Sequence, residues 1–517
     1  MTSRSAITGS GSTLPPSTAP TATEPTSATA ATDEAVVEYQ MIIGGEHVAA
    51  ADGQTFEVMN PALGRVMARV PLGGPEDVDR AVKAARAAFD DPRGFSTWSA
   101  AKRGRTLQKY SALVKAHLEE LAQLEARNVG KPISSARGEA LGVSLVFEYY
   151  AGAANKVFGE TIPTSRPGFD FTLREPIGVV GLIVPWNFPM NMASWKIGPA
   201  LAAGNTCILK PASWTPLSAI RLGELALEAG FPPGVVNVVT GPGGSAGAAL
   251  AAHPGVGKIA FTGETTTGQE IMRLAAGNIK KMSLELGGKS PNICFADADL
   301  ERFARESPAS VFDNAGQDCC ARSRILVERS VHDKVVELFA EATRRIVVGD
   351  PLDDKTEVGS LVSFKQRDRV AGYVAAGLAE GAELVVGGKA PDAAEFCNGA
   401  FYLPTVFDAA RTEMKIVREE IFGPVVSIIP FDDEAEAIRL ANDTPYGLSG
   451  SIWTRDLARG LRVARAVQAG VLSINSNSSV HTEAPFGGYK MSGVGRELGM
   501  HAMDLYTELK NVFVDLA

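Results

Sequence analysis

The sequence is poor in cysteine and histidine, and neither residue is spaced as a metal site. The five cysteines include no Cys-x-x-Cys pair, and the six histidines include no His-Glu-x-x-His motif. Scattered cysteines in a small, odd number argue against a disulfide scaffold or a structural zinc site, and the histidines give no support to metal catalysis. We therefore expect no metal, a reducing compartment and a cytoplasmic location.

Long apolar runs and an excess of positive charge are also absent. No apolar run reaches the roughly 18 residues that cross a bilayer, so we expect no membrane association. The formal net charge of −9 would repel phosphate-rich polymers, so we expect no nucleic-acid partner. The contents of 45% hydrophobic and 21% charged residues are ordinary for a soluble globular protein. A chain of 517 residues exceeds what one hydrophobic core usually holds, so two or three domains are expected.

Large apolar residues are almost missing from the start of the chain. From Met1 to about Glu34 the sequence consists mainly of Ser, Thr, Ala and Pro. Such a composition buries too little surface to offset the entropy of ordering, so we expect residues 1–37 to form a disordered tail. A transit peptide would be Arg-rich and amphipathic, whereas Arg4 is the only basic residue before the folded region begins.

Apolar periodicity predicts helices in the first folded part of the chain. Residues 41–45 read as a strand that enters a tight turn. The ranges 76–89, 100–129 and 136–157 repeat apolar residues at intervals of three and four. We expect these three ranges to form amphipathic helices that pack on a sheet.

From Gly178 onward, short apolar runs alternate with helical stretches. The expected strands are 179–184, 206–209, 235–239, 258–261 and 281–286, with helices from about residues 193, 215, 244 and 266. Strands joined in this way form a parallel, doubly wound sheet with right-handed crossovers. Sheets of this kind bind nucleotides at the carboxyl ends of their strands.

A second alternation of strands and helices begins at Pro291 and predicts a second α/β domain. Its expected strands are 324–327, 424–430, 449–454 and 471–475. The range 505–514 reads as a further strand with little sequence after it. An edge strand of this length promotes aggregation unless another subunit pairs with it, so we expect an oligomer.

Three motifs carry candidate chemistry. The run Gly316-Gln317-Asp318-Cys319-Cys320 offers a thiol nucleophile, and Leu284-Glu285-Leu286-Gly287-Gly288-Lys289 offers a carboxylate. A thiol attacks only as its thiolate, so it needs a base or an environment that lowers its pKa. In Pro185-Trp186-Asn187-Phe188-Pro189, Asn187 follows a strand, where its amide can donate to an oxyanion. Each motif alone also fits a buried cysteine or a turn asparagine.

Taken together with Glu420-Ile421-Phe422-Gly423-Pro424, these motifs strongly resemble the aldehyde dehydrogenase superfamily. The resemblance runs from about Tyr39 to the C-terminus and includes the run 485–493. It implies an α/β fold with a Rossmann-type cofactor domain, an α/β catalytic domain and a small β oligomerisation arm. The implied boundaries are 38–152 and 175–287 for the cofactor domain, 288–490 for the catalytic domain, and 153–174 with 491–517 for the arm and C-terminal strand.

The resemblance also implies the catalytic roles. Cys319 is the expected nucleophile and Glu285 the general base, and Asn187 forms the oxyanion hole with the backbone N–H of Cys319. Thiolate addition to an aldehyde gives a thiohemiacetal, which loses hydride to a nicotinamide and leaves a thioester for hydrolysis. Cys320 is the rival nucleophile, but the family pattern places it one residue late.

The cofactor contacts implied by the resemblance include Lys210 at the adenosine ribose, Glu420 at the nicotinamide ribose and Phe422 beside the nicotinamide. The full set of expected cofactor-binding residues is Val184, Pro185, Trp186, Lys210, Ser213, Gly243, Gly263, Glu264, Leu286, Glu420 and Phe422. Ser213 stands where many NAD-preferring members of the family have a ribose-binding glutamate, and the loss of that carboxylate removes a barrier to NADP. Glu264 replaces the usual serine and adds a negative charge near the phosphates, which acts in the opposite direction. The expected cofactor is NAD or NADP.

The substrate is less determined than the cofactor. Tunnel positions implied by the resemblance are Asn191, Met192, Trp195, Asp313, Asp318, Asn477, Ser478, Ser479, Val480 and Phe486, of which we select Asn191, Trp195, Asp318, Ser478 and Phe486. Asp318 resembles the betaine and aminoaldehyde branch, because a carboxylate at the mouth attracts an ammonium group.

Several alternatives stay open at this point. The substrate is an amino or trimethylammonium aldehyde, or a small aliphatic aldehyde or a semialdehyde. A CoA-acylating dehydrogenase is disfavoured because such members of the family generally lack a glutamate at the position of Glu285. The intact set of Cys319, Glu285 and Asn187 disfavours a retired relative that serves as a binding protein. The resemblance implies a homodimer or a homotetramer.

Overall fold

The fold was obtained as a computed structural model, which describes residues 35–478 and 480–516. The expected disordered tail therefore lies almost entirely outside the described residues, as does the tunnel candidate Ser479. Residues from Val36 onward form one compact unit. No helix of the described part of the chain is long and apolar enough to cross a membrane.

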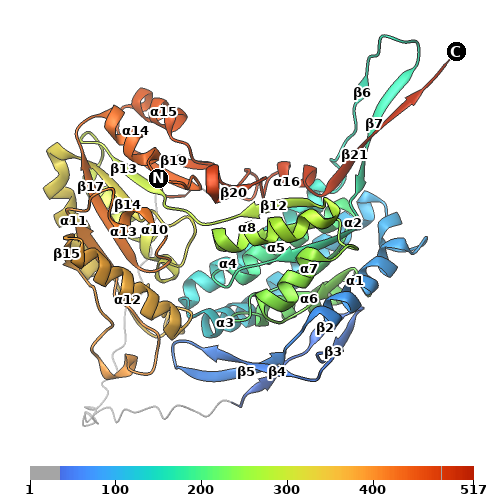
Figure 1. Cartoon of the computed structure of the whole chain (residues 1–517), viewed down its shortest axis with the longest axis horizontal. Coiled ribbons are helices and arrows are strands. Elements are labelled where there is room, and N and C mark those ends of the chain that lie inside the picture. The colour runs from blue at the N-terminus through green and yellow to red at the C-terminus, as the bar shows by residue number, and fades with distance from the viewer. Residues whose placement is uncertain (1–34, 479, 517) are drawn as a thin grey trace, which may run out of the picture. The chain divides into compact units, whose positions relative to one another are not determined.

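An eight-stranded sheet contains the first predicted α/β alternation (Figure 1). Its order is β20-β12-β11-β8-β9-β10-β2-β3, and the five strands from β12 to β10 are parallel. The bounds are β2 (Met41–Ile43), β3 (Glu46–Val48), β8 (Val179–Ile183), β9 (Thr206–Lys210), β10 (Val236–Val238), β11 (Lys258–Thr262), β12 (Lys281–Glu285) and β20 (Gly493–Val494). The predicted strands are thus present to within one or two residues.

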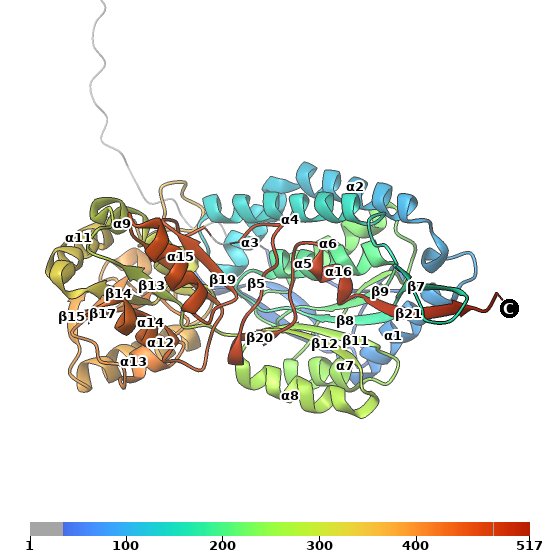
Figure 2. The same cartoon turned by 90° about the horizontal axis from the view of Figure 1, so that it is seen from above.

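Helices cover both faces of this sheet, as Figure 2 shows. Along β8, Val180 and Leu182 join the core on one face, whereas Val179 and Ile183 join the core on the other. A strand covered on both sides is apolar throughout, which is why β8 reads as one continuous apolar run. The covering helices are α1 (Pro75–Asp90), α2 (Ala100–Ala116), α3 (Leu118–Val129), α4 (Ile133–Ala153), α5 (Pro189–Ala203), α6 (Leu217–Ala229), α7 (Ala248–Ala252) and α8 (Thr265–Ala275).

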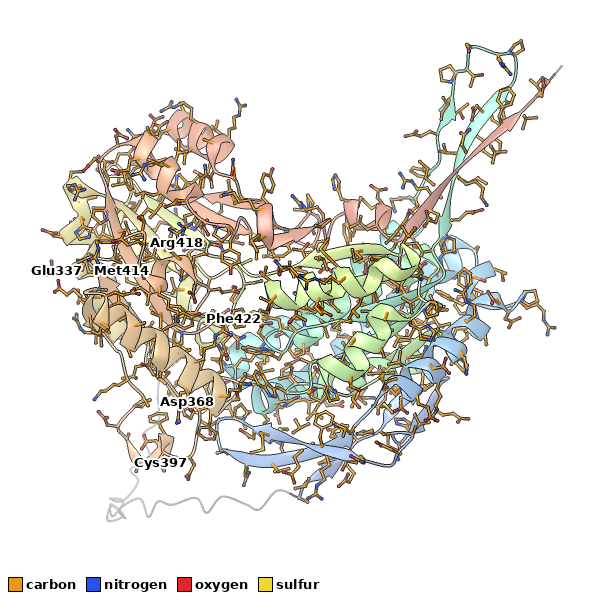
Figure 3. The ribbon with its side chains drawn as sticks, in the orientation of Figure 1. Glu337, Asp368, Cys397, Met414, Arg418 and Phe422 are labelled. Carbon is orange, nitrogen blue, oxygen red and sulfur yellow. The ribbon has the colours of Figure 1, made fainter. Side chains whose placement is uncertain are left out.

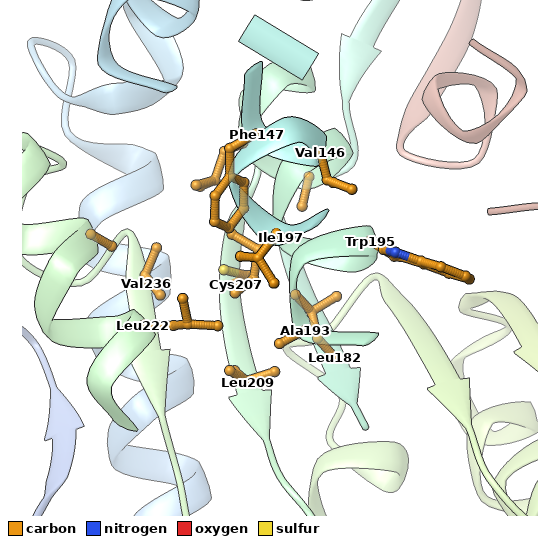
Figure 4. Close-up of a cluster of buried hydrophobic side chains, with 14 of the residues drawn as sticks. Val146, Phe147, Leu182, Ala193, Trp195, Ile197, Cys207, Leu209, Leu222 and Val236 are labelled. Carbon is orange, nitrogen blue, oxygen red and sulfur yellow. The ribbon is translucent and has the colours of Figure 1, made fainter. Parts of the chain in front are cut away.

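The helix expected over 100–129 is divided at His117. The φ and ψ angles of His117 are −98° and 20°, outside the α-helical range, so α2 ends there and α3 begins. The range expected from about residue 244 starts instead as a π-helical turn, Gly243–Gly247, before α7. Figure 4 shows part of the core on the α5 side, where Cys207, Leu209 and Leu222 meet.

A seven-stranded sheet forms the second α/β region, and all its neighbouring strands are parallel except β15 and β16. Its order is β15-β16-β17-β14-β13-β18-β19. The strands are β13 (Pro291–Cys294), β14 (Arg324–Glu328), β15 (Glu383–Val386), β16 (Thr405–Asp408), β17 (Val425–Phe431), β18 (Ser449–Trp453) and β19 (Val471–Ile474). The helices are α9 (Leu300–Glu306), α10 (Ala309–Phe312), α11 (His332–Arg344), α12 (Phe364–Ala379), α13 (Lys415–Arg418), α14 (Glu434–Asn442) and α15 (Leu457–Ala466).

Two three-stranded sheets complete the fold. In one, β21 (Thr507–Val514) pairs antiparallel with β7 (Phe169–Pro176), which also pairs with β6 (Thr161–Ile162). The predicted C-terminal strand is therefore paired within its own chain through one edge, and its other edge has no partner in this sheet. The second sheet contains β1 (Val37–Glu38), β5 (Arg65–Pro71) and β4 (Thr55–Asn60) and was not predicted. The short helix α16 (His501–Asp504) precedes β21.

Candidate active site

A cavity of about 710 Å³ lies at the carboxyl ends of the parallel strands of the eight-stranded sheet. Its walls include residues that end or follow β8, β9, β11 and β12, together with Cys319 and Glu420 from the second α/β region. Ligands of doubly wound sheets bind at this edge, and the volume is in the range of small-molecule and cofactor sites. The cavity therefore has the location that the sequence predicts for the active site.

Most of the predicted site residues line this one cavity. All eleven expected cofactor residues and all three expected catalytic residues are part of its wall, and so are Asn191, Trp195, Asp318 and Phe486. Ser478 is exposed and lies outside the lining. The secondary candidates Met192 and Val480 also line the cavity, whereas Asp313 and Asn477 do not.

Sequence reasoning missed a group of wall residues on α12. Lys365, Gln366 and Arg369 face the cavity from the first turns of this helix. Gln366 donates to the backbone oxygen of Phe422 at 2.7 Å, which ties α12 to the motif around Glu420. Figure 3 labels Phe422 and, on the neighbouring turn of α12, Asp368. The first turns of the helix carry charges on several sides, so the sequence contains no signal that one of these turns lines a ligand site.

The loop that carries Cys319 has an uncommon backbone. Asn314, Ala315 and Gly316 have consecutive positive φ angles of 50°, 55° and 69°. A Cβ at Gly316 would lie 2.2 Å from the backbone oxygen of Gly423, so only glycine fits at this contact. Gln317 holds the loop by donating to the backbone oxygen of Asn314 and by accepting from the backbone N–H of Val362, both at 2.9 Å. Strained backbone of this kind is concentrated at functional sites.

The thiol of Cys319 is held in its protonated form. A hydrogen bond with the Cys320 side chain is the largest cause of a pKa well above that of an ordinary cysteine, and burial and the charge of Asp318 add to it. Asp318 in turn accepts from the backbone N–H of Cys320 at 2.8 Å. Cys319 is partly accessible from the cavity, whereas Cys320 is buried. A nearby base is therefore needed before Cys319 can attack.

Glu285 supplies a candidate base at the end of β12. Its side chain is buried, and neither of its carboxylate oxygens has a hydrogen-bond partner among the described residues. Burial raises its pKa well above that of an ordinary glutamate, and the charge of Glu497 raises it further. The buried Lys196 opposes this shift, and it donates to Glu497 at 2.5 Å and to Thr262 at 2.6 Å.

Asn187 is fixed directly to the cysteine loop. Its side-chain amide donates to the backbone oxygen of Gln317 at 2.8 Å, and its own backbone oxygen accepts from the side chain of Asn314 at 2.9 Å. A primary amide has two N–H donors, so one is left for a ligand. The buried Asn187 is thus positioned beside Cys319 by the same loop.

Two buried carboxylates hold the start of α5, which follows the Asn187 loop. Glu125 accepts from the backbone N–H of Met190 at 3.3 Å, and Glu139 accepts from that of Asn191 at 3.1 Å. Lys131 pairs with Glu139. The first N–H groups of a helix have no partner within the helix, and acidic groups near them stabilise it.

The cofactor side of the cavity fits a dinucleotide. Lys210 ends β9, and burial lowers the pKa of its ammonium to about 8. Helix α8 begins at Thr265, whose buried hydroxyl has no hydrogen-bond partner within residues 35–478 and 480–516, and such a helix N-terminus attracts phosphate. Gly243 has open space where a side chain would stand. Ser213 donates to the backbone oxygen of Gly241 at 3.0 Å.

Glu420 and Phe422 lie where the two α/β regions meet. Glu420 accepts from the backbone N–H of Gly288 at 2.9 Å, and burial raises the pKa of its carboxyl to about 7. The ring of Phe422 packs edge-on against Trp186 with the ring centres 5.1 Å apart. Glu264 carries a negative charge at the start of α8, and Arg369 lies 4.0 Å from it across the cavity wall.

The lining of the cavity also contains an aromatic pair and an acidic residue. Trp195 on α5 and Phe486 pack edge-on with their ring centres 5.1 Å apart. Asp318 lines the same cavity next to Cys319, and burial raises the pKa of its carboxyl. Aromatic faces and a carboxylate are the groups that bind organic cations.

Comparison with known proteins is consistent with this geometry. Residues 47–512 match the profile described as "Aldehyde dehydrogenase family". The chain is 45% identical to a betaine aldehyde dehydrogenase of Bacillus subtilis over 92% of this chain and 96% of that protein. It is also 45% identical to human retinal dehydrogenase 2, over 92% of each chain. Identity at this level does not distinguish between the two named substrates.

Solved structures give the same result. A betaine aldehyde dehydrogenase from Staphylococcus aureus in complex with NAD+ superposes with a TM-score of 0.91 at 40% identity, covering 93% of this chain and 95% of that chain. An NAD-dependent aldehyde dehydrogenase from Sinorhizobium meliloti has the same TM-score of 0.91 at 43% identity, with coverage of 93% and 95%.

Proposed function

The chain belongs to the aldehyde dehydrogenase family, and we propose that it oxidises an aldehyde to its carboxylic acid with a nicotinamide nucleotide as hydride acceptor. The observation that carries this proposal is the meeting of Cys319, Glu285 and Asn187 in one cavity. These residues come from three distant segments of the chain, and the cavity also holds every residue expected to bind the cofactor.

In the proposed mechanism, Cys319 forms a covalent bond with the aldehyde carbon. Its proton passes to Glu285 or to solvent, and the developing oxyanion accepts from the side-chain amide of Asn187 and the backbone N–H of Cys319. The nicotinamide, when bound, accepts the hydride that leaves the thiohemiacetal carbon. After any proton taken from Cys319 has passed to solvent, the ionised Glu285 deprotonates the water that hydrolyses the thioester, which releases the acid and the Cys319 thiolate.

For the cofactor we propose NAD, which the solved relatives hold, with NADP also accepted. Ser213 places no carboxylate beside the expected adenosine ribose, so nothing at this position repels a 2′-phosphate. The positive charge of Arg369 near Glu264 offsets the acidic substitution at the start of α8. Initial rates with each cofactor test this, and activity with NAD alone would contradict the role given to Ser213.

For the substrate we propose a small aldehyde that carries an ammonium or trimethylammonium group. Trp195, Phe486 and Asp318 line the cavity that also contains Cys319, and the two rings are in contact. A cation over the face of one aromatic ring gains about 0.5 to 2 kcal/mol, and a nearby carboxylate adds to this attraction.

The test compares two aldehydes of equal shape and different charge. Betaine aldehyde and 3,3-dimethylbutyraldehyde differ mainly by replacement of a quaternary nitrogen with carbon. We expect a higher kcat/KM for betaine aldehyde, and we expect Asp318→Asn to reduce that preference. Equal kcat/KM for the two aldehydes would instead assign the enzyme to small neutral aldehydes. The wider panel includes 4-aminobutyraldehyde, succinate semialdehyde and acetaldehyde.

The reaction class is tested with the same panel by following the absorbance of reduced cofactor. We expect formation of acid without CoA and no stimulation by CoA. Absence of cofactor reduction with every aldehyde and both cofactors, from folded protein, would refute the proposed reaction.

A further inference from the structure

The cysteine loop also contains a group of side chains that suits a soft metal ion. Asp318, Cys319 and Cys320 place one carboxylate oxygen and two sulfur atoms within 4.8 Å of one another. Across residues 35–478 and 480–516, this is the one group of three such side chains at this spacing. Two thiols with one oxygen ligand favour Zn²⁺ or Cd²⁺ over Mg²⁺ or Ca²⁺, because thiolates are soft ligands.

A second feature of the cavity points the same way. Glu285 lines the same cavity, and the charges of Glu285 and Cys320 influence each other. Both carboxylate oxygens of Glu285 are buried without a partner among the described residues. A buried carboxylate is normally paired or bound to a metal, so Glu285 is available as a partner for metal-bound water.

We propose that Asp318, Cys319 and Cys320 form a reversible binding site for one Zn²⁺ or Cd²⁺ ion, with a metal-bound water facing Glu285 in the same cavity. On binding, two S–H bonds break, two metal–sulfur bonds form and two protons pass to solvent, with no change in oxidation state. The metal occupies the nucleophile, so bound metal switches the enzyme off. This loss of turnover rests on the proposed function of Cys319, whereas metal binding itself does not.

The other cysteines of the chain do not offer such a site. Cys207 and Cys294 are buried single thiols in strands, and Cys397 is an exposed single thiol. Figure 3 shows Cys397 well apart from Phe422, which lines the cavity. Cys397→Ser is therefore a matched control that removes one thiol from the chain and leaves the proposed site intact.

The binding test uses Cd²⁺ as a spectroscopic probe, so it requires no turnover. Reduced protein is titrated with Cd²⁺, and the thiolate-to-cadmium charge-transfer absorbance is measured together with the bound metal per chain. We expect one tightly bound Cd²⁺ in the wild type and in Cys397→Ser. Cys320→Ser should lose about half of the absorbance. Equal absorbance in the wild type and Cys320→Ser, or loss of the band in Cys397→Ser, would overturn the site.

The inhibition test uses Zn²⁺ with each variant normalised to its own metal-free rate. We expect Cys320→Ser and Asp318→Asn each to weaken inhibition at least about tenfold, the size of effect that even outer-shell changes produce at metal sites. Excess chelator should restore the rate without added reductant. Recovery that requires a reductant would show a disulfide in place of a metal site, and Asp318→Asn keeps the test decisive if Cys320→Ser fails to fold.

Discussion

At the scale of single residues, the two reactive groups of the candidate active site have pKa values that differ from those of exposed side chains. The thiol of Cys319 and the carboxyl of Glu285 both have raised pKa values, for different reasons. The thiol shares a hydrogen bond with Cys320, whereas the carboxyl is buried beside another carboxylate, Glu497. A raised pKa makes the Glu285 carboxylate, once it is ionised, a stronger base toward the Cys319 thiol or toward water.

The first prediction concerns which cysteine attacks. Cys319→Ser should lower kcat by at least about a thousandfold, because an alkoxide nucleophile is not generated by a carboxylate base and a serine ester is less reactive than a thioester. Cys320→Ser should retain most of the turnover, because the hydrogen bond with Cys320 raises the pKa of Cys319 and weakening it leaves the nucleophile in place. Steady-state rates measure both, and the opposite order of activities would assign the nucleophile to Cys320.

The second prediction concerns the pH dependence set by Glu497. The negative charge of Glu497 raises the pKa of Glu285, and Glu285 acts as a base only when it is ionised. Glu497→Gln removes that charge and frees the positive charge of Lys196, so the pKa of Glu285 should fall. The rising limb of kcat against pH should therefore move to lower pH. Glu483→Gln, which is exposed on the same segment, should leave the limb in place, and a shift of the limb to higher pH would contradict the role of Glu285.

At the scale of elements, the sequence predicts the strands and helices whose surroundings are uniform. Strands β8 and β11 are buried on both faces, so each reads as an apolar run. The strands β4 and β5 were missed because exposed and partly buried residues alternate irregularly along them around a bulge. Helix α12 was not predicted to line the site, because its first turns reach the cavity only through packing of the helix against the Glu420 motif, and the sequence of the helix does not show that contact.

The third prediction concerns the support beneath α5. Burial raises the pKa of Glu125 to about 8 in the folded protein, from an ordinary value of 4.5. Between these pH values the unfolded chain releases a proton that the folded chain keeps, so stability falls as pH rises. Glu125→Gln keeps an oxygen that can accept from Met190 and Ser218. The variant has no carboxyl group at this position, so the decline of stability with rising pH that Glu125 causes is removed. The variant should therefore lose less stability than the wild type between pH 5 and pH 8.

Thermal or urea unfolding at three pH values checks this sign. Glu119→Gln on the same helix is the matched control, because Arg137 lowers the pKa of the exposed Glu119 and its contribution therefore changes only at acidic pH. The same decline from pH 5 to pH 8 in Glu125→Gln and the wild type would show that Glu125 does not hold its proton in the folded protein.

At the scale of the whole molecule, the fold is the part that sequence predicts best, and the cavity explains why. The α/β fold inferred from the alternation of strands and helices and from four separated motifs is confirmed by TM-scores of 0.91 to solved relatives. These motifs lie on both α/β regions and meet at one cavity, so each is constrained by the same ligand geometry. The substrate wall is made by scattered residues such as Asn191 and Phe486, which no local pattern brings together.

The arm sheet of β6, β7 and β21 gives the basis for an expected homodimer or homotetramer. Figure 1 shows this sheet extending away from the other elements. It exposes several large apolar side chains, namely Ile162, Phe169, Leu173, Leu509, Phe513 and Val514. Exposed apolar surface together with an unpaired strand edge favours association with another subunit. We propose that a second copy of this chain covers the arm sheet.

The last prediction follows from the position of Leu509 on this sheet. Leu509 is 59% exposed in the single chain, so Leu509→Lys costs little in the folded monomer and places a charge in the proposed interface. The variant should have a lower molar mass by light scattering and keep its helical content. Leu461→Lys, at an exposed leucine on α15, should keep the mass of the wild type. A lysine that is buried without water or a partner destabilises the interface that buries it. A monomeric wild type at micromolar concentration, or an unchanged mass in Leu509→Lys, would therefore show that the arm sheet does not form the subunit interface.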